Sequence, residues 1–245
     1  MDLKSGTASE VLRLKFRSIY PLTADEIAAL ERACTRTYSL ARNQDVIREG
    51  DRPDSCNLLI DGIVCRYKIL PDGQRQILSF QFPGDLFDSQ SFLLDAMDHG
   101  IATISPCVIA TIPHAAMAAL TSEHLRLGRA LWKDTLVDAA IFREWLTNVA
   151  RRTAYQRIAH LFCETFIRVR AIGMARGDTI DWPITQRDIG DALGLTVVHV
   201  NRTLRDMRNA HIISLQSSTL RILDWPALAD AAQFDPAYLQ IRDAA

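Results

Sequence analysis

The sequence has no apolar run long enough to cross a membrane and nothing that resembles a secretion signal. A membrane-spanning helix needs roughly 20 apolar residues in succession, and no such run occurs among the 245 residues. The first residues, MDLKSGTASEVLRLKF, contain no apolar stretch ahead of a cleavage site. We therefore expect a cytoplasmic protein with no membrane partner.

Cysteine is scarce, and its spacing fits no metal site. The five cysteines are far apart and form no CxxC pair or Cys/His cluster. They are Cys34, Cys56, Cys65, Cys107 and Cys163. We expect packed, reduced thiols and no bound metal, with a redox-sensing thiol as the alternative interpretation.

Motifs of common enzymes are also missing. The sequence contains no glycine-rich phosphate loop, no GxSxG and no HExxH. His160 and Cys163 stand three residues apart on one expected helix, and we interpret them as packing residues. We therefore predict that the chain is not an enzyme.

What the sequence does contain is a pattern, over residues 185–212, of two short helices joined by a tight turn. Thr185 suits the N-cap of the first helix, and Gly194 can end it in the left-handed conformation that glycine adopts without steric cost. Thr196 then suits the N-cap of the second helix. The buried stripe expected of that helix has helical spacing: Val200, Leu204 and Met207. Such a helix–turn–helix can place its second helix in the major groove of DNA.

The opposite face of the second helix is mostly polar. Arginine suits guanine and phosphate, and asparagine suits adenine. The predicted base readers are Val198, Asn201 and Arg202, with Thr196 and His199 nearby. The predicted phosphate contacts are Thr185, Gln186 and Arg205. Because the net charge of the chain is only −1, DNA affinity would have to come from this local patch.

An amphipathic helical hairpin without any DNA role would show the same pattern, but the next residues favour DNA binding. Residues 212–215 and 220–223 read as two strands, and Gln216-Ser217-Ser218 reads as the turn between them. A helix–turn–helix followed by a β-hairpin is a winged helix, whose wing can touch the DNA backbone.

The rest of the chain predicts two further parts. Residues 11–37 read as helical, with Thr23 and Glu26 forming a capping box. From Tyr38 to Pro113, short β-rich runs alternate with turn signals, which favours an antiparallel barrel or sandwich.

Residues 115–151 read as one long helix with two apolar stripes. Positions 125, 128, 132, 135, 139, 142, 146 and 149 form a 3–4 repeat, and a second stripe runs through residues 127, 131, 137, 141 and 145. Because a helix that is apolar on two sides needs two partners, we expect one to be the β-domain and the other to be the same helix of a second chain. A helix buried wholly within its own domain is the alternative.

These patterns predict an α+β protein in three parts. The expected parts are a β-roll sensor-like domain with N-terminal helices (1–114), a long dimerisation helix (115–151) and a winged helix–turn–helix domain (152–245).

The order β-roll, long helix and winged helix resembles the CRP–FNR superfamily of bacterial transcription regulators. Four segments carry the resemblance over almost the whole chain: IREGDRPDSCNLLIDGIV, LPDGQRQILSFQFPGDLF, RRTAYQRIAHLF and TQRDIGDALGLTVVHVNRTLRDMRNAHII. The resemblance implies a homodimer that binds a two-fold DNA operator and contacts RNA polymerase.

The departures from the family concern its effectors. Members that bind cyclic AMP carry a Gly-Glu pair followed later by an arginine that neutralises the cyclic phosphate. The matching stretch here, GDLFDSQSFLLDAMDHGIAT, has no Gly-Glu pair and places His99 or Gly100 near the arginine position. An unpaired phosphate charge there would cost several kcal/mol, so we predict no cyclic AMP binding of the usual kind.

The first 33 residues hold no cysteine, so we predict no 4Fe–4S cluster either. His99, His114 and His124 are available as haem ligands, but we interpret them as ordinary histidines.

The second helix of the helix–turn–helix departs as well. Many members carry a glutamate where this chain has Val198, which can meet a thymine methyl group but cannot accept a hydrogen bond from cytosine. Arg202 matches the family's recurrent arginine. We predict a sequence-specific DNA-binding regulator with an effector domain of unknown ligand. The alternative is a ligand- or redox-sensing module whose winged helix docks a protein partner.

Overall fold

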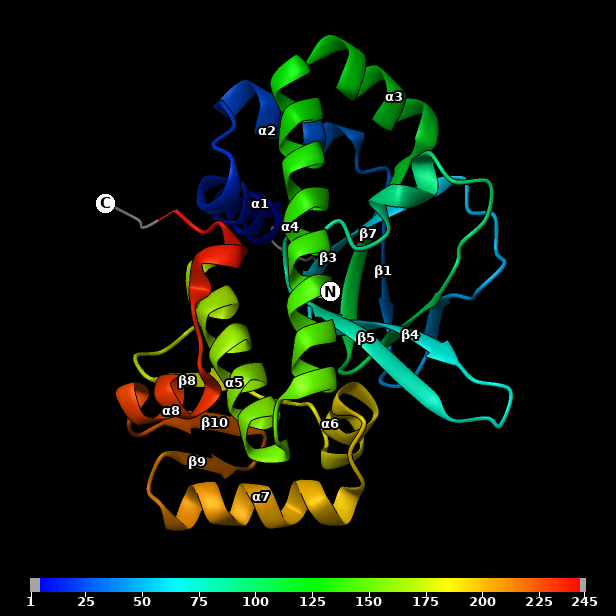
Figure 1. The fold of residues 1–245 in the computed structure, drawn as a ribbon. Coiled ribbons are helices and arrows are strands. Elements are labelled where there is room, and N and C mark those ends of the chain that lie inside the picture. Colours follow the sequence, from blue (N-terminus) through cyan, green and yellow to red (C-terminus); the bar gives the residue numbers. More distant parts are fainter. Residues whose placement is uncertain (1–4, 243–245) are drawn as a thin grey trace. The chain divides into compact units, whose positions relative to one another are not determined.

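The computed structural model describes residues 5–242, with side chains from residue 10 onward (Figure 1). The chain divides into two compact units. Of the described residues, the first unit takes in 5–68, 80–138 and 241–242, and the second takes in Ile69–Ser79 and Ala139–Gln240. In the described part of the chain, no helix is long and apolar enough to span a membrane.

Two antiparallel sheets form the β-roll, which belongs to the first unit except for residues 69–79. One has the strand order β1-β7-β3, and the other has the order β2-β6-β4-β5. The strands are β1 (Arg36–Leu40), β2 (Asp45–Ile47), β3 (Ser55–Asp61), β4 (Val64–Ile69), β5 (Arg75–Gln81), β6 (Gly100–Thr103) and β7 (Cys107–Pro113), and the short helix η1 (Ser89–Phe92) lies between β5 and β6. The prediction of β structure up to Pro113 is confirmed.

Strand β3 is buried on both faces, and its residues alternate between two cores. Leu58 and Ile60 join helices α1 (Ser5–Ile19), α2 (Ala24–Ala33) and α3 (His114–Glu123) in one core. Leu59 points to the opposite side, where it packs with Val64 and Ile101 in the second core. This two-residue period is what an extended strand imposes, and it makes β3 the layer between the N-terminal helices and the interior of the β-roll.

In the helical region predicted over residues 11–37, the capping box is confirmed, but the predicted end is wrong. Thr23 caps α2, and Glu26 completes the capping box as predicted. The helix does not continue to residue 37, however, because Arg36–Leu40 form β1 and pair with β7. This pairing joins residues about 70 apart in sequence, so the local helical pattern could not reveal it.

The long helix is also shorter than predicted at its start. Residues 114–151 form two helices, α3 and α4 (Leu125–Arg151), with a break at His124, whose backbone adopts φ −120° and ψ 83°. The predicted end at Arg151 is confirmed. No proline or glycine stands at the break, so its signal was missing from the sequence.

Helix α4 carries its two apolar stripes as predicted. Four members of the second stripe are buried, and Leu131 is partly buried. The first stripe faces solvent, with Trp132 69% and Leu146 67% exposed. Leu125 and Phe142 of the same stripe are exposed as well.

The second unit consists mainly of helices and a small three-stranded sheet. Its helices are α5 (Ala154–Ala171), α6 (Gln186–Leu193), α7 (Val197–Asn209), α8 (Trp225–Ala232) and η2 (Pro236–Leu239). Strands β8 (Thr179–Asp181), β9 (Ile213–Gln216) and β10 (Thr219–Ile222) form a sheet in the order β8-β10-β9. The predicted hairpin is confirmed as β9 and β10, whereas β8 was not predicted. Phe162 of α5 packs edge-on against Trp182 just after β8, with 4.8 Å between ring centroids, and both side chains are buried.

Candidate nucleic-acid interface

Helix α6 begins at a closed capping box. Asp188 N donates to Thr185 Oγ1 at 3.2 Å, and Thr185 N donates to Asp188 Oδ2 at 3.0 Å. The predicted cap at Thr185 is confirmed, while the partnering Asp188 was missed. The Thr185 hydroxyl also donates to Asp188 at 2.6 Å, so its proton is already engaged within the protein.

The turn between α6 and α7 depends on two glycines. A Cβ on Gly190 would lie 2.6 Å from the carbonyl oxygen of Leu195, so only glycine lets the turn pass so close to α6. Gly194 ends α6 in the left-handed conformation at φ 65°, as predicted. Arg157 of α5 adds a hydrogen bond from Nη1 to Leu193 O at 2.9 Å. These contacts fix the angle between the two helices.

Helix α7 buries the predicted stripe and exposes the predicted outer face. Thr196 Oγ1 accepts from His199 N at 3.2 Å, which confirms the cap. Val200, Leu204 and Met207 have no exposed surface.

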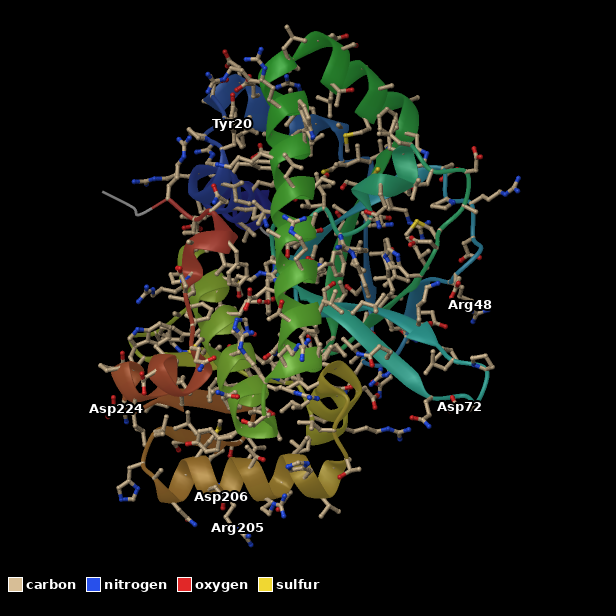
Figure 2. All side chains as sticks on the ribbon, in the orientation of Figure 1. Tyr20, Arg48, Asp72, Arg205, Asp206 and Asp224 are labelled. Atoms are coloured by element: carbon tan, nitrogen blue, oxygen red, sulfur yellow. The ribbon has the colours of Figure 1, made fainter. Side chains whose placement is uncertain are left out.

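Val198 is 80% exposed, Asn201, Arg202 and Arg205 are exposed, and His199 is half-buried. Figure 2 shows Arg205 and Asp206 along this outer helix, and Asp206 is an exposed acidic neighbour that the sequence reasoning did not consider.

Two of the predicted site residues meet across the helix pair. Gln186, the first residue of α6, accepts at Oε1 a hydrogen bond from Asn201 Nδ2 of α7 at 3.2 Å. The wing hairpin turns through Ser217 and Ser218, both with positive φ.

Arg75 was missed entirely by the sequence reasoning. It belongs to β5, within the second unit, and its Nη2 lies 2.6 Å from Asp188 Oδ1 while its Nε donates to Asp191 Oδ2 at 2.8 Å. Burial alone would raise the pKa of Asp188, but hydrogen bonds from Thr185 and the charge of Arg75 outweigh it and lower that pKa. Arg75 therefore offsets two negative charges on the first helix of the pair. No local signal could have revealed it, because it stands 113 residues before Asp188.

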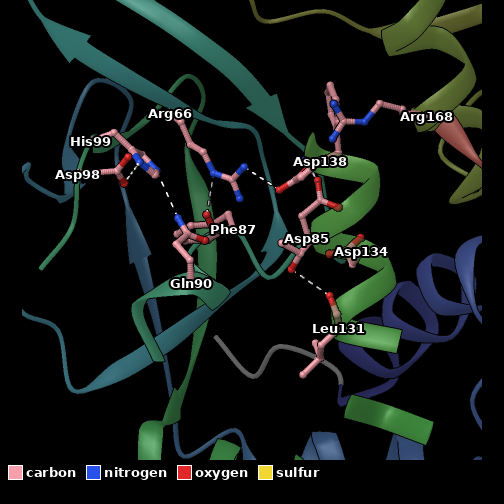
Figure 3. Close-up of polar contacts among 12 residues, drawn as sticks. Arg66, Asp85, Phe87, Gln90, Asp98, His99, Leu131, Asp134, Asp138 and Arg168 are labelled. Atoms are coloured by element: carbon pink, nitrogen blue, oxygen red, sulfur yellow. Dashed lines mark hydrogen bonds and ion pairs between the residues drawn. The ribbon is translucent and has the colours of Figure 1, made fainter. Parts of the chain in front are cut away.

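The residue near the family's arginine position in the β-roll is a buried histidine with partners of its own. His99 Nδ1 lies 2.7 Å from Asp98 Oδ1, and its Nε2 lies 3.4 Å from Gln90 Nε2 (Figure 3). Burial lowers the pKa of His99, although Asp98 opposes that shift. His99 is therefore not a counterpart of a permanently charged arginine.

A buried arginine of the β-roll is committed to protein partners. Arg66 is 3% exposed. Its Nε donates to Phe87 O at 3.0 Å, and its Nη1 lies 2.7 Å from Asp138 of α4 (Figure 3). A guanidinium held by a carbonyl and a carboxylate is not free for another anion without breaking these bonds.

The other two histidines considered as haem ligands are half-buried, and four of the five cysteines are buried. His114 Nε2 lies 3.0 Å from Ser91 Oγ, and His124 is the C-cap of α3. All cysteines are free thiols, and burial raises the pKa of Cys56 and of Cys163 to about 12. Within residues 5–242, no group of three or more His, Cys, Asp or Glu side chains could hold a metal ion.

Two family models match this chain. Residues 38–124 match the cyclic nucleotide-binding domain, and residues 156–231 match the Crp-like helix-turn-helix domain. The nitrogen fixation regulation protein FixK of Bradyrhizobium diazoefficiens is 28% identical over 215 residues, which cover 86% of each chain. The transcriptional activator protein FnrL of Cereibacter sphaeroides is 27% identical over 218 residues, again 86% of each chain. The structure of FixK2 from Bradyrhizobium japonicum superposes with a TM-score of 0.72 at 23% identity, over 80% of this chain and 96% of that chain.

A cyclic-nucleotide-binding-type β-roll, a long helix and a winged helix–turn–helix define the architecture of a transcription regulator with a sensor-like domain. The chain belongs to the CRP–FNR family of transcription regulators.

Proposed function

We propose that this protein is a homodimeric, sequence-specific DNA-binding regulator that acts on a two-fold operator. The observation that carries the proposal is the outer face of α7, where Val198, Asn201 and Arg202 stand exposed on a helix whose opposite side is fully buried. Side chains that point away from a rigid, capped helix can reach base edges in the major groove. FixK and FnrL carry the names of a regulator and an activator, and neither name describes an enzyme.

The proposed dimer is supported by the exposed stripe of α4. Trp132, Phe142 and Leu146 lie on one side of this helix and face solvent in the single chain. Large apolar side chains in a continuous stripe with 3–4 spacing are typical of a seam between paired helices. Two chains joined along α4 would present two copies of α7, which suits a palindromic site. As in the family, RNA polymerase is the proposed further partner.

The first prediction concerns Arg202, the proposed reader of guanine. Replacing Arg202 by Ala should weaken binding to the cognate operator by about 1–3 kcal/mol, which is roughly 5- to 150-fold in affinity. The loss should relax preference at one base pair per half-site, because a bidentate arginine–guanine contact is removed. Fluorescence anisotropy on operator variants selected from a random DNA library would measure both effects.

Arg48→Ala is the matched control, since Arg48 is an exposed arginine of the β-roll outside the proposed interface. It should leave operator affinity unchanged. Equal binding by wild type and Arg202→Ala would show that Arg202 reads no base. A weak dependence of wild-type binding on salt concentration, without sequence preference, would favour the alternative in which the winged helix docks a protein.

We propose further that the β-roll does not take cyclic AMP in the usual way. The support is the buried His99 near the expected arginine position and the commitment of Arg66 to Phe87 and Asp138. Cyclic AMP at millimolar concentration should therefore leave the thermal midpoint of unfolding unchanged, because a ligand that binds only the folded state would raise it. A saturable, concentration-dependent rise in the midpoint would overturn this proposal.

A further inference from the structure

A hydrogen bond between Gln186 and Asn201 ties the two helices of the helix–turn–helix together at the proposed DNA face. Asn201 Nδ2 donates to Gln186 Oε1 at 3.2 Å, and the two residues stand 15 positions apart. Gln186 is half-buried and Asn201 is exposed. A contact between a base-reading position and the first turn of the preceding helix can set how the base reader is presented.

The backbone on both sides of this bond is fixed. Gln186 follows directly after the capped Thr185, and Asn201 lies in the second turn of α7, whose cap is Thr196. The two helices are joined by a tight turn in which a Cβ on Gly190 would lie 2.6 Å from Leu195 O. The remaining freedom is therefore that of the two side chains, and the hydrogen bond restricts both.

The bond to Gln186 uses one N–H of Asn201 and leaves the other groups of its amide available to a base. An asparagine amide has one carbonyl oxygen and two N–H donors. When one N–H is given to Gln186, the oxygen and the other N–H remain, which are the two groups that adenine N6 and N7 take in the major groove. The amide nitrogen of Gln186 keeps its own N–H donors, which suit a phosphate oxygen.

The neighbours of Asn201 on α7 complete a reading surface. Val198 lies one turn before it on α7 and is 80% exposed, so it can contact a thymine methyl group. Arg205 lies one turn after it and is exposed. Asn201 therefore stands between an apolar contact and a cation, on the strip of α7 that faces away from the protein.

We propose that Gln186 is a positioning residue that holds Asn201 in the orientation for reading adenine and links this reading to a phosphate contact by α6. The proposal rests on the proposed function, because it presumes that α7 enters the major groove. Its benefit is pre-organisation, since an exposed asparagine that is already held loses less rotamer freedom when it binds.

The test measures base preference, which a purely structural or purely electrostatic role of Gln186 would not change. Operators with each of the four bases at every position are titrated by fluorescence anisotropy, and Asn201→Ala identifies the position that Asn201 reads. Wild type should favour adenine there by roughly 5- to 150-fold. Gln186→Met, which keeps the size of the side chain but removes the acceptor, should reduce this preference by roughly 3- to 10-fold at that position alone.

Two further variants separate positioning from phosphate binding. Gln186→Glu keeps the acceptor oxygen and adds a negative charge, so it should retain the adenine preference while weakening binding to all sequences. Gln44→Met, at an exposed position between β1 and β2 of the β-roll, controls for a surface methionine outside the proposed interface and should change neither quantity. In Gln186→Met/Asn201→Ala, the first substitution should add nothing to the loss of preference.

The outcomes distinguish this proposal from the proposed function. If wild type binds operator specifically and Gln186→Met keeps the full adenine preference, or loses affinity equally for all four bases, Gln186 does not position Asn201. If wild type shows no sequence preference at all, the proposed function fails, and the positioning role fails with it.

Discussion

Leu146→Glu is expected to turn a dimeric protein into a monomer and to abolish tight operator binding. Leu146 is 67% exposed on the outward stripe of α4. In a two-fold seam along this helix, the substitution would bring two carboxylates together and remove two leucine side chains, each worth about 1.5–3 kcal/mol when fully buried. We expect the dimer dissociation constant to rise by at least roughly 100-fold.

DNA binding should report the same change. A monomer contacts one half-site and loses the gain that comes from linking two reading helices, so affinity for a full operator should fall by about 100-fold or more. Light scattering measures the oligomeric state, and anisotropy on full and half operators measures the loss. Affinity for an isolated half-site should change little.

Thr147→Glu provides the matched control on the same helix. Thr147 is exposed, and it lies 100° around the helix from Leu146. This variant adds the same charge beside the stripe and should remain dimeric. A Leu146→Glu protein that stays dimeric, or a wild type that is monomeric at micromolar concentration, would remove the basis of the proposed seam.

The second large effect is expected from His160, as a loss of stability on mild acidification. His160 is 1% exposed in α5, and its ring packs against Phe234 and Tyr238. Glu144 Oε1 lies 3.3 Å from His160 Nε2, but this carboxylate already pairs with Arg152 at 2.7 Å. Burial, together with the Arg152 charge, lowers the pKa of His160 to about 3.

The sign of the pH dependence follows from the protonation of the unfolded chain. A histidine in the unfolded chain takes up a proton near pH 6.5, whereas the folded protein keeps His160 neutral down to about pH 3. His160 therefore stabilises the fold fully above pH 6.5, and this contribution is lost as the pH falls below 6.5. The loss between pH 7.5 and pH 5 should be about 2 kcal/mol.

The measurement is a difference between variants, because other groups titrate in the same range. Urea unfolding at pH 7.5 and at pH 5 should show that His160→Phe loses about 2 kcal/mol less than wild type over this interval. Cys163→Ala is the control on the same helix: its thiol is buried and neutral throughout the range. It should lower stability equally at both pH values. A parallel pH dependence of wild type and His160→Phe would contradict the assigned neutral state.

Much of the winged helix–turn–helix could be predicted because the sequence signals for its helices and turns are local. The caps at Thr185 and Thr196, the left-handed Gly194 and the stripe from Val200 to Met207 depend on residues three or four positions apart. The backbone of a helix alone brings such residues together. The wing was predictable for a similar reason, since a two-residue turn joins β9 and β10 directly.

Contacts between distant segments were beyond this reasoning. The pairing of β1 with β7 ended the first predicted helical region early, and the break at His124 divided the predicted long helix. The ion pairs of Arg75 and the bond from Arg66 to Asp138 join residues that stand far apart in sequence. No periodicity marks which distant partner a charged side chain will meet.

The amino-acid sequence by itself determined where the two helices of the helix–turn–helix begin and end, which face of α7 is buried, and that α4 has two apolar sides. Helix propensity, capping and periodicity depend on residues only a few positions apart. Only the tertiary structure decided which of the two sides of α4 is covered by its own chain, how the charges of α6 are offset and that Asn201 donates a hydrogen bond to Gln186. These outcomes depend on distances between segments that are set when the whole chain packs.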